Sequence, residues 1–375
     1  MKLGIDAREI QNGVYTGIGG PLANFLNYFS SFDDKDECIL FSSKDIPLDF
    51  GKKIRNVVIE EKNTFYWDQF LLPKALEQEA IEIFYSPYYK IPLRSPCLTI
   101  SAILDLMYFA VDHYRRELSL FKKIYYFTFA KMMAQKANWV LTCSENSKQD
   151  IITFYGVDAQ KIKVIPLSID NHYRFDAEED VLPLVHKKFG IDSLYIFYFG
   201  NFKYHKNINR VIKAFKRIIP EFREIKLVLA GPKEHYYLQH QTLVNELSLK
   251  DKVMFLGKIS DREDARLLYT GAKMFVMPTL YEGFGLPPVE AMACGTPVIT
   301  SNTSSLPEVM GEAGILVDPY KIDEITTAMR KLLQDKSLCE ELGQRGLKQY
   351  KNFTEEKIAK QTYAFFKKVW KECQK

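Results

Sequence analysis

The stretch Tyr195-Ile-Phe-Tyr-Phe-Gly-Asn-Phe-Lys-Tyr-His-Lys-Asn207 decides the fold class of this chain. Its first five residues form the apolar run of a buried strand, and Gly200 favours a turn directly after it. A helix is predicted to follow from Ile208 to Ile219. Strand, loop and helix in this order are the repeating unit of a parallel sheet that helices cover on both faces. The stretch therefore predicts an α/β protein.

The same alternation occurs twice in the 375 residues. A chain of this length exceeds the usual size of one hydrophobic core, so we expect two Rossmann-like, doubly wound domains facing each other across a cleft. The first domain is predicted over 1–185 and the second over 186–354. The charged segment 170–190 is interpreted as a linker with a short helix, and the C-terminal helix near 355–375 is expected to pack back on the first domain.

The predicted elements of the first domain alternate regularly. Its strands are expected near 2–7, 38–42, 54–60, 82–85, 98–104, 139–143 and 162–165. Its helices are expected near 20–30, 66–79, 117–136 and 145–155.

The composition is that of a folded soluble protein, with 47% hydrophobic and 26% charged residues. No apolar run approaches the length of a membrane span, and Met1 to Asp6 reads as a strand rather than a signal peptide, so a cytoplasmic location is expected. The six cysteines are scattered singly, which is not the pattern of a metal site or a disulfide scaffold. A formal charge of +4 gives no reason to expect nucleic acid as a partner.

The stretch Glu282-Gly-Phe-Gly-Leu-Pro-Pro-Val-Glu290 carries the strongest chemical signal. Its two prolines fit a first helical turn, so a helix N-terminus follows the glycine turn. The backbone N–H groups of Phe284, Gly285 and Leu286, with the helix dipole, form an anion site, and Glu282 and Glu290 can accept hydrogen bonds from sugar hydroxyls. A carboxylate that only stabilises its own helix would explain Glu290 but not Glu282. The whole arrangement is suited to binding a sugar that is attached to a phosphate.

Two other loops follow predicted strands. Lys206, helped by Lys203 or His205, stands before a helix and suits the negative charge of a departing diphosphate, although a solvated surface lysine is the alternative. The glycines of Thr16-Gly-Ile-Gly-Gly20 allow close approach of a phosphate or sugar, but the loop lacks the spacing of a dinucleotide-binding fingerprint. Ser304 and Ser305 are typical of a capped helix start.

Several motifs, in this order, closely resemble the retaining, nucleotide-sugar-dependent glycosyltransferases of family four, which have two Rossmann-like domains in the arrangement called GT-B. The resemblance is strongest from about Gly200 to Pro319 and looser in the first half, where it rests on Thr-Gly-Ile-Gly, Ser86-Pro-Tyr, Asp105-Leu and Cys143-Ser-Glu-Asn-Ser-Lys. The motifs of the second half are Gly200 to Asn207, Ala230-Gly-Pro, Phe255-Leu-Gly, Glu282 to Ala293, Gly295-Thr-Pro-Val and Leu306-Pro-Glu-Val.

The resemblance implies that the first domain lies on the acceptor side and that the second binds the nucleotide sugar. It also implies a role for each matching residue. Lys206 matches the lysine that binds the donor diphosphate, and Glu282 matches the carboxylate beside the donor sugar. Phe284, Gly285 and Leu286 match backbone contacts to sugar and phosphate. Glu290 matches the carboxylate that binds the ribose, and Gly17 and Gly19 match the first-domain loop over the phosphates. Asp105 matches a catalytic position at the end of the strand near 98–104.

The chain departs from the family at two positions. Many members carry His-Asp-Leu where this chain has Leu104-Asp105-Leu106, and many pair the lysine with an arginine where this chain has His205. A same-face mechanism, in which the leaving diphosphate takes the proton of the acceptor, needs no side-chain nucleophile, so retention and an active enzyme remain the expectation. A nucleotide-sugar-binding partner of another transferase, with weak or no turnover, is the alternative.

The resemblance also bears on ligands and partners. No cofactor and no metal are expected, because the Asp34-Lys-Asp36 motif precedes a strand and reads as a solvated turn. The His-Lys-Asn loop resembles mannosyl- and other hexosyltransferases of bacterial surface polysaccharides, including lipopolysaccharide, which favours GDP-mannose as donor and a glycan or lipid-linked acceptor. Residues 115–136 hold six basic residues against one acidic residue among many aromatic ones, which suits peripheral membrane contact or a helix covering the first sheet.

Overall fold

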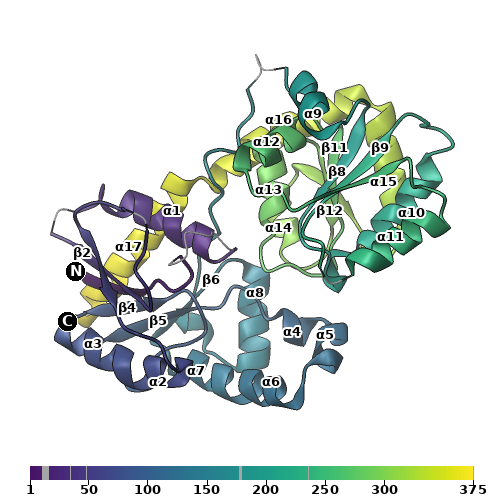
Figure 1. The fold of residues 1–375 in the computed structure, drawn as a ribbon. Helices are drawn as coiled ribbons and strands as arrows, with labels where there is room; N and C mark the ends of the chain where they lie inside the picture. The colour runs from purple at the N-terminus through teal and green to yellow at the C-terminus, as the bar shows by residue number, and fades with distance from the viewer. Residues whose placement is uncertain (11–16, 34, 48, 177–179, 235, 375) are drawn as a thin grey trace. The chain divides into compact units, whose positions relative to one another are not determined.

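The computed structural model describes residues 1–10, 17–33, 35–47, 49–176, 180–234 and 236–374, which form two compact α/β units (Figure 1). The first unit comprises Met1–Asp170 and Thr354–Lys375, and the second comprises Asn171–Phe353. None of the helices in these described ranges has the length and apolar character that crossing a bilayer requires.

The first unit contains a parallel sheet with the strand order β3-β2-β1-β4-β5-β6-β7. Its strands are β1 (Lys2–Asp6), β2 (Glu37–Ser42), β3 (Ile54–Val58), β4 (Ile83–Ser86), β5 (Leu98–Ala102), β6 (Trp139–Thr142) and β7 (Ile162–Val164). Its helices are α1 (Gly19–Phe29), α2 (Thr64–Tyr66), the π-helix η1 (Trp67–Leu71), α3 (Leu72–Gln78), α4 (Met107–Ala110), α5 (Asp112–Glu117), α6 (Leu120–Ile124), the π-helix η2 (Tyr125–Ala130), α7 (Lys131–Lys136), α8 (Glu145–Asp150), the π-helix η3 (Ile151–Tyr155), the 3-10 helix η4 (Ala159–Lys161) and α17 (Glu355–Cys373).

Alternation along the strands divides the core of the first unit between the two faces of the sheet. In β2, Cys38 and Leu40 pack in the cluster beneath α1 and α17, whereas Ile39 and Phe41 pack on Trp67 of η1. All five side chains are buried. Because successive residues of a strand point to opposite faces, a strand buried on both sides contains a continuous apolar run, as Cys38 to Phe41 do here.

The C-terminal helix α17 is part of the first unit. The rings of Phe366 and Phe25 lie 5.7 Å apart, and those of Phe365 and Trp139 lie 5.4 Å apart. Ile169 pairs with Thr354 as a β-bridge, so the chain leaves the unit and returns to it at the same place. Burial of this apolar helix face removes a large aromatic surface from water.

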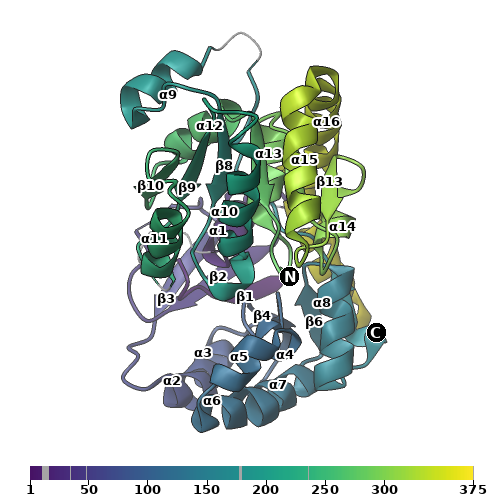
Figure 2. The same cartoon turned by 90° about the vertical axis from the view of Figure 1, so that its right-hand side faces the viewer.

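The second unit repeats the architecture with the strand order β10-β9-β8-β11-β12-β13, again all parallel. Its strands are β8 (Tyr195–Phe199), β9 (Lys226–Ala230), β10 (Val253–Gly257), β11 (Met274–Met277), β12 (Val298–Ser301) and β13 (Gly314–Val317). Its helices are α9 (Leu182–Phe189), the 3-10 helix η5 (Tyr204–Lys206), α10 (Ile208–Ile218), α11 (Tyr237–Glu246), α12 (Arg262–Thr270), α13 (Leu286–Ala293), α14 (Leu306–Met310), α15 (Ile322–Gln334), α16 (Lys336–Gln349) and the 3-10 helix η6 (Tyr350–Asn352). Helices α10, α11 and α15 pack together, as do α12, α13 and α16 (Figure 2).

The two strand orders fix where a ligand site can form. In each unit the strand order reverses beside the first strand, between β1 and β4 in the first unit and between β8 and β11 in the second. The loops that leave neighbouring strands at such a switch point diverge to opposite faces and leave a crevice at the carboxyl ends of the strands. The loops after β8 and β11 carry Lys206 and Glu282.

The predicted α/β class with two doubly wound parallel sheets is confirmed. The boundary between the units lies at Asp170 and Asn171 rather than near 185, because the segment interpreted as a linker folds on the second unit. There the ring of Tyr173 lies 5.8 Å from that of Tyr269, and α9 packs on α12.

Three local expectations differ from the structure. Residues 107–116, for which no element was expected, form α4 and most of α5. The expected helix 117–136 is divided into the end of α5, α6, η2 and α7. Asp36 is buried and paired with Lys367 at 3.0 Å, so the prediction of a solvated turn is wrong for Asp36. Asp34 lies outside the described residues.

Candidate active site

The loop after β8 holds Lys206 in one position at the switch point of the second unit. Gly200 leaves the strand with a φ of +148°, and a Cβ on the neighbouring Gly231 would lie 2.0 Å from the carbonyl oxygen of Gly200. The ends of β8 and β9 therefore approach closely because Gly231 lacks a side chain. The loop then forms η5, on which the side chain of Lys206 is buried.

Asn207 ties this loop to two others. Its backbone is left-handed, with a φ of 61°, and its buried side-chain amide donates hydrogen bonds to the carbonyls of Pro278 at 2.8 Å and Pro319 at 2.7 Å. Its amide oxygen accepts a hydrogen bond from Arg210 at 2.7 Å. Asparagine tolerates the left-handed conformation better than most residues and supplies both a donor and an acceptor. The loops after β8, β11 and β13 are thereby held together.

The turn that carries Glu282 is held by two serines of the loop after β12. The Ser304 hydroxyl accepts a hydrogen bond from the backbone N–H of Glu282 at 3.0 Å. The Ser305 hydroxyl donates to the carbonyls of Glu282 at 2.9 Å and Phe284 at 3.1 Å. Ser305 precedes α14 but makes no side-chain cap hydrogen bond, so the expectation of a capped helix start is wrong.

The turn ends in a glycine that leaves no room for a side chain. Gly285 is the N-cap of α13 with a φ of 92°, and a Cβ there would lie 2.6 Å from Leu306. Pro287 and Pro288 fall in the first turn, as expected from their missing N–H groups, and no side chain caps the helix start. The positive end of the α13 dipole therefore faces the turn without a protein side chain to cap it.

The structure brings Lys206 and Glu282 into direct contact. The Lys206 ammonium lies 2.6 Å from a carboxylate oxygen of Glu282, and their side chains are 9% and 13% exposed. An ion pair removed so far from water is weakly screened, and the contact orients both side chains. A fixed cation beside a fixed carboxylate, next to a helix N-terminus, can bind a phosphate and the hydroxyls of an attached sugar together.

His205 does not supply the second cation that the sequence suggested. Its side chain is buried, and desolvation, with the neighbouring charges of Lys206 and Lys203, lowers its pKa to about 2. A neutral imidazole at physiological pH cannot act as a second cation. Its backbone carbonyl instead accepts a hydrogen bond from Leu280 at 2.7 Å, which joins the loops after β8 and β11.

Glu290 lies in the second turn of α13 and is half-buried. One of its carboxylate oxygens accepts a hydrogen bond from the buried Tyr269 hydroxyl at 2.8 Å. Burial raises the pKa of the Tyr269 hydroxyl, and the adjacent Glu290 carboxylate raises it further. The hydrogen bond from Tyr269 therefore orients the Glu290 carboxylate. Contact between Glu290 and a ribose stays a prediction.

The other predicted site residues lie in the first unit. Gly17 is exposed, whereas Gly19 is buried and begins α1, which was predicted near 20–30. Thr16, which begins the same motif, lies outside the described residues. Asp105 follows β5, is exposed, and accepts a hydrogen bond from the backbone N–H of Met107 at 3.1 Å.

Three residues with structural roles at the site were not assigned these roles from the sequence. Asn207 and the pair Ser304 and Ser305 hold the loops that present Lys206 and Glu282. All three belong to motifs quoted above, but their contacts join segments far apart in the chain. Spacing along the sequence carries no signal for such contacts.

Family models match both units of the chain. The model described as "Glycosyltransferase Family 4" matches residues 45–173, and the model described as "Glycosyl transferases group 1" matches residues 184–349, which includes both Lys206 and Glu282. The chain belongs to the group 1, family 4 glycosyltransferases. The predicted family is therefore confirmed.

Within this family, the chain is similar to individual mannosyltransferases. It is 35% identical over 232 residues to O-antigen chain mannosyltransferase B of Escherichia coli, covering 62% of this chain and 61% of that protein. It is 34% identical over 216 residues to O-antigen chain mannosyltransferase RfbU of Salmonella typhimurium, covering 58% and 57%. The chain spans about three fifths of the length of these relatives.

A solved structure shares the whole fold of this family member. Sucrose-phosphate synthase from Thermosynechococcus elongatus superposes with a TM-score of 0.79 over 99% of this chain and 100% of that one, at 18% identity. At this identity the likeness concerns the fold alone.

Proposed function

We propose that this protein transfers mannose from GDP-mannose to a glycan or lipid-linked acceptor in the synthesis of a bacterial surface polysaccharide. The named activities of the two relatives support the sugar and the pathway class. The observation that carries the chemistry is the Lys206–Glu282 pair beside the N-terminus of α13.

In the proposed reaction, the acceptor hydroxyl oxygen attacks the anomeric carbon of mannose as the bond from that carbon to the diphosphate breaks. The acceptor proton passes to the leaving diphosphate oxygen on the same face, so the product keeps the anomeric configuration. Lys206 and the start of α13 stabilise the negative charge on the diphosphate, and Glu282 holds sugar hydroxyls. Stabilisation of a leaving group by prepositioned charge is a major source of enzymatic rate enhancement.

We propose that the reaction needs no metal ion. A metal ion in a phosphate-transfer enzyme usually neutralises the negative charge of the diphosphate. Here the buried ammonium of Lys206 and the positive end of the α13 dipole would neutralise that charge. Activity that survives strong chelation would agree with this assignment.

We also propose that residues 115–136 contact a membrane surface, where a lipid-linked acceptor would be found. Leu120 and Phe121 are 75% and 80% exposed, and Lys122 and Lys123 follow them directly. An exposed apolar group next to basic residues suits the headgroup region of an anionic bilayer.

The function is tested by incubating the purified protein with GDP-mannose, UDP-glucose and UDP-galactose, with and without an α-linked mannose disaccharide. We expect transfer from GDP-mannose, a product of retained configuration by proton NMR, and loss of turnover in Glu282→Ala and Lys206→Ala. An inverted product would contradict the mechanism. Tight donor binding without hydrolysis or transfer would instead favour the nucleotide-sugar-binding partner suggested by Leu104 and the neutral His205.

A further inference from the structure

The aromatic ring of Phe353 packs against the turn that precedes α13. Phe353 is the last residue of the second unit, and its ring meets the ring of Phe284 edge-on, with centroids 5.4 Å apart. Both side chains are buried. An edge-to-face pair of buried rings is favourable and has a defined geometry. The side chain of Phe284 is therefore held by a residue from a distant part of the chain, outside the motif that forms the turn.

The backbone of Phe284 is held as well as its ring. The Phe284 carbonyl accepts a hydrogen bond from the Ser305 hydroxyl at 3.1 Å, and the Glu282 carbonyl accepts one from the same hydroxyl at 2.9 Å. Because the ring and the carbonyl of Phe284 are both fixed, its backbone can rotate little. The N–H groups of Gly285 and Leu286 follow directly, so their direction depends on how Phe284 is held. These N–H groups belong to the predicted anion site at the start of α13.

The segment that carries Phe353 is fixed to the helices around the site. Helix α16 packs on α13, and at its end the Gln349 side-chain amide donates a hydrogen bond to the carbonyl of Val309 in α14 at 2.9 Å. The 3-10 helix η6 follows, and the backbone N–H of Phe353 donates to the carbonyl of Tyr350 at 2.8 Å. The ring of Phe353 therefore has a firm support from which to hold the turn.

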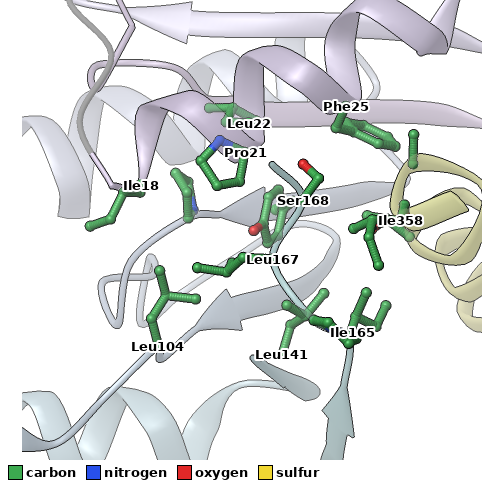
Figure 3. A pocket seen from close by; sticks show the side chains of 15 residues that line it. Ile18, Pro21, Leu22, Phe25, Leu104, Leu141, Ile165, Leu167, Ser168 and Ile358 are labelled. Carbon is green, nitrogen blue, oxygen red and sulfur yellow. Dashed lines mark hydrogen bonds between the residues drawn. The ribbon is translucent and has the colours of Figure 1, made fainter. Parts of the chain in front are cut away.

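The residues after Phe353 are anchored in the first unit. Thr354 pairs with Ile169 as a β-bridge. Ile358, in α17, lines a cavity of about 50 Å³ together with Ile165 (Figure 3). A cavity this small leaves the side chains around it closely packed. The chain is thus held on both sides of Phe353, which limits the movement of its ring.

The position of the turn determines which part of a donor would depend on Phe353. In the proposed function, the start of α13 stabilises the diphosphate and Glu282, which precedes the turn, holds the sugar. The N–H groups of the turn would therefore meet the phosphate that carries the sugar. Hydrogen bonds to a charged oxygen are strong but weaken steeply when the donor is misaligned. A small shift of the turn should reduce binding of that phosphate and leave the nucleoside contacts unchanged.

We propose that Phe353 is a positioning residue for the donor diphosphate, and that it acts by holding the ring of Phe284. The identity of the bound group as a nucleoside diphosphate rests on the function proposed above. The contact between the two rings does not.

The first test compares the affinities of the parent and of Phe353→Leu for GDP and GMP by calorimetry. Leucine keeps the position apolar but removes the edge-to-face contact. We expect the affinity for GDP to fall roughly threefold to tenfold and the affinity for GMP, which lacks the second phosphate, to stay unchanged. An equal fall for both nucleotides, or no fall for either, overturns the proposal. If Phe353→Leu does not fold, Phe353→Met, which has a flexible side chain without a ring, takes its place.

The matched control is Phe215→Leu, which replaces a buried phenylalanine on α10 of the same unit. We expect this variant to lower the temperature of thermal unfolding, as Phe353→Leu does, but to leave the ratio of the GDP and GMP affinities at the parent value. A ratio that changes equally in the control and in Phe353→Leu would reflect a general loss of packing and would overturn the proposal.

A double-mutant cycle tests whether Phe353 acts through Phe284. If it does, combining Phe353→Leu with Phe284→Leu should weaken GDP binding about as much as either change alone, because the ring contact is lost only once. Losses that add in the double variant overturn this route.

The same measurements with UDP and UMP separate this proposal from the proposed donor. A parent that binds UDP but not GDP contradicts GDP-mannose as the donor, and the ratio of the UDP and UMP affinities then carries the test of Phe353. A parent that binds neither diphosphate more tightly than its monophosphate overturns the positioning role.

Discussion

The ammonium nitrogen of Lys206 lies 2.6 Å from a carboxylate oxygen of Glu282, although the two residues are separated by 76 positions in the chain. The contact forms because the loops after β8 and β11 leave the sheet side by side at its switch point. The pair places in one position the cation and the carboxylate to which the proposed function assigns the diphosphate and the sugar hydroxyls.

Removal of the cation is expected to affect turnover more than folding. Lys206→Ala should lower kcat on the order of 10²–10³-fold, the usual cost of losing one charge-stabilising group in a transition state. It also leaves the Glu282 carboxylate without its partner, which should cost about 1–3 kcal/mol of stability. Initial rates and thermal unfolding measure both effects. Lys213→Ala, an exposed lysine on α10, should change neither; equal rates in the two variants would contradict the assignment.

The backbone conformation and the side chain of Asn207 are expected to make separate contributions to the stability of the protein. Asn207→Gly keeps access to the left-handed conformation but loses the hydrogen bonds to Pro278 and Pro319, each worth about 0.5–1.5 kcal/mol. Asn207→Ala loses the same bonds and adds about 1 kcal/mol of backbone strain. Chemical denaturation should therefore rank the parent above the glycine variant and the glycine variant above the alanine variant. Equal stability of all three would show that the amide does not hold the loops together.

Burial of His205 predicts how stability depends on pH. The unfolded imidazole has a pKa near 6.5, whereas burial beside Lys206 and Lys203 lowers the folded pKa to about 2. Below pH 6.5 the unfolded chain therefore binds a proton that the folded chain does not, and stability falls as the pH drops toward 2. The slope for one proton is about 1.4 kcal/mol per pH unit.

The His205 contribution is isolated by comparing the parent with His205→Leu between pH 6.5 and 4.5. His240, whose pKa burial lowers to about 4, contributes in the same direction and is present in both proteins. The variant should lose stability less steeply with falling pH. Parallel pH profiles for the two proteins would mean that His205 is accessible to protons.

Gly285 and Gly190 form a matched pair for testing the turn. Both have positive φ, but a Cβ at Gly285 would lie 2.6 Å from Leu306, whereas a Cβ at Gly190 would meet no atom within 4 Å. Gly190→Ala should lower the free energy of unfolding only through backbone strain, by about 1 kcal/mol. Gly285→Ala should cost more and also weaken binding of GDP-mannose, measured by calorimetry, because the turn before α13 must shift. Unchanged donor affinity would separate this turn from the donor site.

Membrane contact is expected to depend on both charge and apolar surface. Charge reversal at Arg115, Arg116, Lys122 and Lys123 should abolish co-sedimentation with vesicles containing phosphatidylserine, since each basic residue near an anionic surface contributes about 1 kcal/mol. Phe121→Ser should weaken binding at low and high salt alike. Turnover of a lipid-free acceptor should be unchanged, and co-sedimentation that survives the charge reversal would exclude this surface.

The apolar runs of the sequence predicted the strands closely. The runs near 54–60 and 98–104 became β3 (Ile54–Val58) and β5 (Leu98–Ala102), and the other first-unit strands ended within a residue or two of expectation. Apolar residues dominate most of these strands, so their limits are visible in the chain itself. The strand β3 is partly exposed and includes Arg55 and Asn56. The segments 107–117 and 170–190 mix charge with aromatic residues, and their local pattern therefore indicated neither α4 and α5 nor the packing of Tyr173 on the second unit.

By itself, the sequence determined the repeated α/β pattern, the glycine turn before α13 and the residue types able to bind a sugar and a phosphate, because these depend on neighbours in the chain. Only the tertiary structure decided that Lys206 reaches Glu282, that Asn207 joins three loops, that His205 is neutral and that Phe353 packs against Phe284. Distances, burial and desolvation arise when segments far apart in the chain pack together, and no local pattern of residues encodes them.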